Sequence, residues 1–423
     1  MNLLAFRMLL IYVCIMLVQP QNRFTFLWPL HIADLSFIAA VALHVLSCIQ
    51  DRRPIVRLGP ATILALLLLM FAFLSQVAGV YQVSSAWNPY LDIIVKNALL
   101  LILLEAMMTS VKRVWAVQMV VLIATLWWVK SGLRLSAAGA TYAGDRLMGA
   151  AVGLIENPNS FAYMMCLFLP LYLYTFQQAK KKWESYAFLM LAMASVFIIF
   201  QTGSRTGLVT LICLSLFLLP RYGRHHGKGL LGIILAVCIL FPMSGEKNIQ
   251  RFKSIPQSVA SFFGKNTEEP RPMNQDEQSA DERQQKNIQT WGLIKEHFIF
   301  GVGVNPDSSK YAERWPMARG QVHCEILMAG RQMGFIGMSL YVGFWMVILI
   351  GGGLIRSRAK GWPVVADLGW IFQLQGLCLI VGGSFCPLPW HPPMMMLAAS
   401  ASALSGLLAQ PDILLAEGAS PAA

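Results

Sequence analysis

The sequence Gly320-Gln-Val-His-Cys-Glu-Ile-Leu-Met-Ala-Gly330 lies at the end of the one long polar segment, residues 245–331, where the chain becomes apolar again. The whole sequence of 423 residues is 56% hydrophobic and only 13% charged. Such a composition excludes a soluble multidomain protein and a disordered chain. We therefore expect a polytopic membrane protein in which residues 245–331 lie outside the bilayer.

Apolar runs long enough to cross roughly 30 Å of hydrocarbon recur along the whole chain. Because a backbone in lipid must satisfy its own hydrogen bonds, each continuous run predicts a transmembrane helix. The sequence thus predicts an all-α fold with about twelve spans, near residues 4–19, 27–48, 59–80, 91–109, 114–132, 159–178, 185–201, 206–220, 229–243, 332–355, 364–382 and 391–409.

Lysine and arginine set the expected orientation, because short cytoplasmic loops are enriched in them. They concentrate in alternate loops, at residues 52–57, 112–113, 180–182, 221–228 and 356–360. Both termini are then cytoplasmic, and the polar segment faces the periplasm or the cell exterior. The expected organisation is N-terminal spans in residues 1–243, one large external loop with short helices in 244–331, and C-terminal spans with a cytoplasmic tail in 332–423.

The net charge of +12 would suit a nucleic-acid partner only if the charge were gathered in one region. Most of the excess lies in the short loops, so we expect no nucleic-acid partner. The cysteines lack zinc or iron–sulfur spacing and no acidic cluster offers a divalent-metal site, so no metal and no cofactor are expected. Cys324 and Cys386 both fall near the external face, where they either form a disulfide or remain unpaired packing residues.

His323 is the candidate proton carrier, because it lies at the external entry of a helix-like run and histidine titrates near neutral pH. A lone histidine can also be a capping or core residue. The basic residues assigned to the same side of the membrane favour the catalytic role.

Arg205 and Arg146 are candidates for binding an anionic substrate. Arg205 lies in the turn Gln201-Thr-Gly-Ser-Arg-Thr-Gly207 between two spans, where it either binds substrate or reaches lipid headgroups. Arg146 either binds substrate or pairs with Asp145. Guanidinium groups bind phosphates in a bidentate manner, so arginines rather than Mg²⁺ would carry the charge of a leaving pyrophosphate.

Arg283 and Lys286 are the candidate cations of the polar segment. They follow the capping-box sequence Ser279-Ala-Asp-Glu282, which predicts a helix. Its apolar positions, among them Ile288 and Trp291, recur at helical spacing. We expect this apolar face to rest on the bilayer or on the membrane domain.

Four short motifs together resemble the O-antigen ligase and polymerase superfamily: Asn157-Pro-Asn159, Ser204-Arg205, the Trp291 helix followed by Gly301-Val-Gly303, and His323 followed by Gly334-Phe-Ile-Gly337. Their order and spacing match over roughly residues 140–345, about half of the chain. One large external loop before the tenth of about twelve spans is similar to the O-antigen ligases in particular. The resemblance implies a GT-C-like architecture in a bacterial inner membrane.

The resemblance implies a metal-independent, inverting glycosyltransferase that works at the periplasmic face. The donor would be O-antigen polysaccharide on undecaprenyl pyrophosphate, and the acceptor would be a sugar hydroxyl of lipid A–core oligosaccharide. His323 matches the histidine that activates this hydroxyl, and Arg205 matches the arginine that holds the pyrophosphate. Arg283, or Lys286 in its place, would be the second cation from the loop.

The sequence departs from the family pattern at two places, and two other functions compete with a ligase. Cys324 stands where an asparagine is usual, and no arginine stands where the pattern before Trp291 is commonest. An O-antigen or exopolysaccharide polymerase would run the same chemistry on two lipid-linked donors. Such polymerases usually show two sizeable external loops, whereas this chain has one and a modest loop at 131–160, which favours a ligase. A lipid-linked glycan transporter would show internal repeats with broken helices, which are not apparent here.

Overall fold

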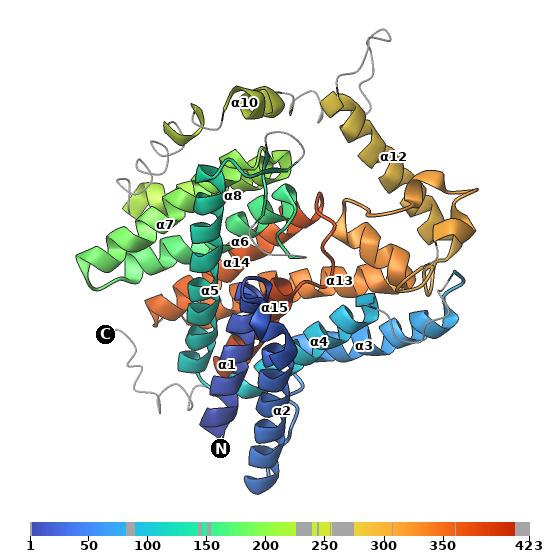
Figure 1. Ribbon diagram of the computed structural model, residues 1–423. Helices are drawn as coiled ribbons and strands as arrows, with labels where there is room; N and C mark the ends of the chain where they lie inside the picture. Colours follow the sequence, from blue (N-terminus) through green and yellow to red (C-terminus); the bar gives the residue numbers. More distant parts are fainter. Residues whose placement is uncertain are drawn as a thin grey trace.

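The computed structural model describes residues 2–81, 89–142, 146–149, 154–225, 239–242, 245–253, 255, 275–306, 308–359 and 361–410. These residues are mostly helical (Figure 1), and a short antiparallel ladder joins β1 (Thr141–Tyr142) to β2 (Arg146–Leu147). The α-helices are α1 (Asn2–Val18), α2 (Ile32–Gln50), α3 (Pro60–Ala78), α4 (Pro89–Met107), α5 (Val111–Ala137), α6 (Pro158–Gln178), α7 (Lys182–Gln201), α8 (Arg205–His225), α10 (Glu246–Lys253), α12 (Gln275–Glu296), α13 (Glu325–Arg358), α14 (Pro363–Gly383) and α15 (Pro392–Leu407). Short 3-10 helices lie at Pro20–Asn22, Thr25–Leu30, Ser308–Tyr311 and Pro316–Ala318.

The all-α, polytopic fold class is confirmed. Among the residues that the structure describes, 7 segments are long and apolar enough to cross a membrane: Asn2–Asn22, Thr25–Gln50, Pro60–Ala78, Val111–Ala137, Lys182–Gln201, Glu325–Arg358 and Pro363–Gly383. The span expected near 229–243 falls largely outside the described residues. The count of about twelve spans therefore stays a prediction.

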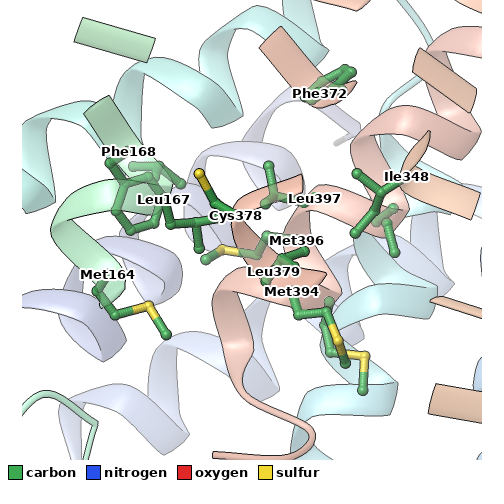
Figure 2. Packing of buried hydrophobic residues seen from close by; sticks show 14 of the residues in the cluster. Met164, Leu167, Phe168, Ile348, Phe372, Cys378, Leu379, Met394, Met396 and Leu397 are labelled. Carbon is green, nitrogen blue, oxygen red and sulfur yellow. The ribbon is translucent and has the colours of Figure 1, made fainter. Parts of the chain in front are cut away.

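Helices α6 and α15 lie inside the bundle. Every residue of α6 from Pro158 to Thr175 is buried, and so is every residue of α15 from Pro393 to Ser405. A helix surrounded by other helices needs no lipid-facing surface, so it need not be as apolar as a peripheral span. Figure 2 shows part of this core, in which flexible methionine side chains pack among branched and aromatic ones; its labelled residues include Met164, Leu167, Phe168, Cys378, Met394 and Met396.

Helix α13 is broken near its start, and the break is filled by another segment of the chain. Met333 and Gly334 have non-helical backbone angles, and Gly334 has φ 64° and ψ −157°. The loop after α12 inserts there, because Phe335 N donates to Phe298 O (2.7 Å) and Val302 N donates to Arg331 O (2.9 Å). The loop thus provides partners for backbone groups at the break.

The two glycine motifs of the family resemblance meet at this break. A Cβ on Gly301 would lie 2.6 Å from both Arg331 O and Gly334 N, so only glycine permits the two backbones to approach this closely. The helix also begins at Glu325, earlier than the expected start of the span at residue 332. Arg283 and Lys286 lie on the helix before this loop, and His323 lies just before α13. The contacts at the break therefore join the segments that carry these three residues.

A helix is present where the capping box predicted one, but α12 begins at Gln275, so Ser279 lies inside the helix and does not cap its start. The apolar residues of α12 lie on two faces. Leu293 is buried and packs with Val302, Tyr311, Ala318 and Trp315 of the loop that follows. Ile288 and Trp291 are instead 55% and 40% exposed. Figure 1 shows α12 (gold) running down to the start of α13 (orange), against which it packs.

Candidate active site

His323 lies on the short loop that enters α13, within the electrostatic reach of two cations of α12. The side chain is half-buried, and its Nδ1 has no hydrogen-bond partner among the described residues. Burial, followed by the charges of Arg283 and Lys286, lowers the pKa of His323 to about 4. The structure thus brings His323, Arg283 and Lys286 together. The imidazole is neutral at pH 7 and can accept a proton.

Arg331 holds the loop that carries His323. This side chain is 6% exposed, and its Nη1 donates to Ala318 O (2.9 Å) and Gly320 O (2.6 Å). In the sequence, Arg331 marks only the end of the polar segment. An arginine at the entry to an apolar helix is itself a signal of function, because its burial is costly without such partners.

Arg146 lies in a second cluster, which joins two motifs that are far apart in the sequence. Its Nε donates to Thr202 O (3.0 Å) and its Nη2 donates to Asn159 Oδ1 (2.6 Å). Ser204 Oγ donates to the same Asn159 oxygen (2.9 Å). The start of α6 is therefore tied to the turn that precedes α8, and Arg205, half-buried, is the first residue of α8.

Asn157 and Gly203 fix the local backbone of this second cluster. The Asn157 side chain accepts from Asn159 N (2.8 Å), which begins α6 at the residue expected from the sequence. Gly203 has φ 55°, and a Cβ there would collide with the side chain of Asn248 on α10. The motif Asn157-Pro-Asn159 was recognisable in the sequence, whereas the hydrogen bonds that Asn159 accepts from Arg146 and Ser204 had no sequence signal.

Cys386 lies beside the start of α6, next to the second cluster. Its Sγ lies 3.4 Å from Oγ of Ser160, the residue after Asn159. Burial raises the pKa of Cys386 well above its ordinary value, while the charge of Arg283 acts to lower it. Arg283 therefore acts electrostatically on a thiol that contacts the start of α6. Cys324 and Cys386 are both free, so of the two alternatives for this pair the structure has unpaired cysteines.

The described part of the chain contains no cluster of three or more His, Cys, Asp or Glu side chains that could hold a metal ion. Metal independence stays a prediction. The candidate site instead offers a neutral imidazole on which the charges of a guanidinium and an ammonium act, while Arg205 and Arg146 belong to the second cluster, at the start of α8 and in β2. This arrangement suits a reaction in which a proton is removed from one reactant and a dianionic group leaves from another.

Two family models match the chain. Residues 188–342 match the family described as O-antigen ligase, and this segment contains Arg205, Arg283, Lys286 and His323. Residues 4–179, which contain Arg146, match a family of unknown function (DUF5935). A search of curated proteins found no match. The match over residues 188–342 supports membership of the O-antigen ligase and polymerase family.

Proposed function

We propose that the protein is an O-antigen ligase, a metal-independent inverting glycosyltransferase of the bacterial inner membrane. It would move O-antigen polysaccharide from undecaprenyl pyrophosphate to a sugar hydroxyl of lipid A–core oligosaccharide at the periplasmic face. The observation that carries the proposal is the neutral, half-buried His323 beside Arg283 and Lys286. Membership of the family is consistent with lipid-linked glycan substrates.

The proposed step forms one bond and breaks one bond. The acceptor oxygen attacks the anomeric carbon of the donor, and the bond from that carbon to the pyrophosphate oxygen breaks with inversion. His323 accepts the proton of the hydroxyl as the new bond forms. The pyrophosphate leaves with the electron pair, and Arg205, Arg283 and Lys286 stabilise its charge. Arg146 holds the turn that bears Arg205 and adds its own positive charge.

The same cations that bind the donor make His323 a weak base in the empty site. A bound pyrophosphate offsets the charges of Arg283 and Lys286, which removes two of the causes that lower the pKa of His323. The imidazole is then a stronger base when donor is present than when it is absent. The proposed site thus couples donor binding to activation of the acceptor.

This coupling predicts a pH dependence. With the His323 pKa at about 4 in the free protein, transfer at low donor concentration should fall only as the pH drops toward that value. Arg283→Gln removes a charge that lowers the pKa, so the acidic limb of kcat/KM should move to higher pH. Lys295→Gln, an exposed change on the same helix, is the matched control. An acidic limb that stays in place in Arg283→Gln contradicts the coupling.

Arg205→Lys should lose more activity than the retained charge suggests. An ammonium cannot supply the planar fork that accepts two phosphate oxygens. A charge-assisted hydrogen bond contributes about 1.5–3 kcal/mol, so we expect transfer to fall by roughly tenfold or more. The measurement is the rate of transfer at matched protein level, with Arg134→Lys as a control at another arginine outside the site. Wild-type transfer by Arg205→Lys would remove Arg205 from the donor site.

The proposed orientation predicts which residues face the periplasm. Gln285, exposed on α12, should lie outside, and Ser357, exposed near the end of α13, should be cytoplasmic. Single cysteines at these two positions, in a background without other cysteines, should therefore differ in labelling by an impermeant maleimide in spheroplasts. Equal labelling, or labelling of Ser357→Cys alone, contradicts the orientation.

A reconstituted reaction tests the ligase directly. Purified protein in lipid nanodiscs receives lipid-linked glycan donor and lipid A–core acceptor, with and without EDTA. A ligase produces acceptor-linked glycan and free undecaprenyl pyrophosphate at equal rates in both conditions. Growth of the lipid-linked glycan in the absence of acceptor indicates a polymerase instead. Loss of transfer in EDTA contradicts a metal-independent mechanism.

A further inference from the structure

A buried carboxyl group lies directly behind the loop of His323. Glu325 is the first residue of α13 and is 0% exposed. Its Oε2 accepts from Tyr341 Oη (2.5 Å), and its Oε1 lies 3.8 Å from Nε2 of His391. Oε1 makes no hydrogen bond to the described residues. The proton transfer proposed above does not use this group.

His391 is held in its neutral form by a helix cap. Its Nδ1 accepts from Met394 N (3.2 Å) at the start of α15. An imidazolium would place a second N–H on Nδ1, facing the Met394 N–H, and would lose the cap. The nearest basic nitrogen therefore gives Glu325 no positive charge.

The ion pairs of the described residues give Glu325 no lysine or arginine partner. A fully buried carboxylate without a cation is very unfavourable, and such a group takes up a proton instead. The position of Glu325 in the first helical turn favours the anion through the helix dipole, but this effect is small beside the loss of hydration. These opposing effects favour the neutral acid.

The carboxyl group joins helices that are distant in the sequence. Tyr341 comes from the second part of α13, and Tyr163 of α6 places its Oη 3.5 Å from His391 Nε2. A Cβ on Gly382 would collide with the Tyr163 ring, and a Cβ on Gly383 would collide with the Glu325 carboxyl. This Gly-Gly pair at the end of α14 thus makes room for the buried cluster.

We propose that Glu325 acts as a neutral, hydrogen-bonded positioning residue that fixes His323 against the cations of α12. The inference rests on the proposed function. His323 is two residues before Glu325, and Arg331 holds the chain on the other side through Gly320 O (2.6 Å). The loop is therefore anchored at both ends, and a shift of the first turn of α13 would move the imidazole away from the acceptor hydroxyl.

The test separates the protonation of Glu325 from its effect on transfer. We compare the infrared spectra of the full-length wild-type protein and of Glu325→Gln, both in nanodiscs at pH 7. The wild-type spectrum should contain a protonated-carboxyl C=O band that Glu325→Gln removes. Glu296→Gln is the control, because Glu296 pairs with Arg314 (2.6 Å) and is 29% exposed; it should leave that band unchanged. The infrared measurement needs no enzymatic activity, so its result is valid whether or not the protein is a ligase.

The kinetic arm compares substitutions at the same position. Glu325→Gln keeps the shape and a hydrogen-bonding amide, so it should retain transfer close to the wild-type rate. Glu325→Ala should lower kcat by on the order of 10²-fold with little change in the donor KM, because the imidazole is misplaced while the cations remain. Tyr341→Phe, which keeps the ring, should lower kcat in the same direction. Absence of the infrared band, or a glutamine variant as slow as the alanine variant at equal thermal stability, overturns the proposal.

Discussion

Replacing His323 with alanine should lower glycan transfer by about 10²–10⁴-fold, the usual contribution of a general base. A sugar hydroxyl has a pKa far above neutrality, so its attack on the anomeric carbon depends on a group that removes the proton as the bond forms. The leaving pyrophosphate is stabilised by positive charge and needs no proton. One residue therefore carries the proton chemistry, and His323 is the neutral imidazole that lies beside the cations.

The alanine variant should remain folded and should still bind the undecaprenyl-linked donor, since the proposed donor contacts are those of Arg205, Arg283 and Lys286. His323→Gln keeps hydrogen bonding without basicity and separates positioning from proton transfer. His31→Ala, at an exposed histidine far from the site in sequence, is the control for a general effect of losing a histidine. Rescue by glutamine would reduce His323 to orienting the substrate, and wild-type turnover by alanine would exclude it as a base.

The second large effect is expected from Gly334→Ala. The φ of 64° and ψ of −157° at Gly334 lie in a region that is essentially restricted to glycine, where another residue costs about 1–3 kcal/mol. A Cβ would also lie 2.5 Å from Ile299 O, a backbone atom that cannot rotate away. We expect the loop after α12 to be pushed out of the break in α13. Arg283 and Lys286 would then lose their place beside His323, with a loss of transfer on the order of 10²-fold.

Gly353→Ala is the matched control for this substitution. Gly353 is also on α13, and a Cβ there would meet only the end of the Gln373 side chain, at 3.3 Å. The two variants are compared by thermal unfolding in detergent and by rate of transfer. Gly334→Ala should unfold at a lower temperature and transfer slowly, whereas Gly353→Ala should resemble the wild type. Equal stability and equal rates for the two variants would show that the break in α13 does not position the site.

The sequence was sufficient to predict most of the long apolar helices, although not all of their bounds, because apolar runs and turn residues are local signals. It also proposed Arg283, Lys286 and His323 for one site; the charges of the two cations act on His323 in the structure, and the roles of these residues stay a prediction. The expected span near 229–243 and the full count of spans stay predictions, since residues 226–238 lie outside the described part of the chain.

Long-range polar contacts could not be predicted from the same signals. Arg331 resembled the end of a loop because its partners, Ala318 O and Gly320 O, are backbone atoms with no sequence signature. Glu325 resembled an ordinary first-turn acid because Tyr341 and His391 become its neighbours only when α13 and α15 pack. The start of α13 was placed too late for the same reason. A charged residue such as Glu325 makes a stretch look too polar for a membrane span. In the fold, however, partners from other helices support the burial of this residue.

The most direct test of the central claim is a lipopolysaccharide gel of a strain that lacks this protein and carries a plasmid copy. The empty plasmid should give intact lipid A–core without any ladder of attached polysaccharide. Wild-type protein should restore the ladder, and His323→Ala at matched membrane level should not. A ladder restored by His323→Ala, or a single repeat unit on the core in the strain with the empty plasmid, would contradict an O-antigen ligase that uses His323 as its base.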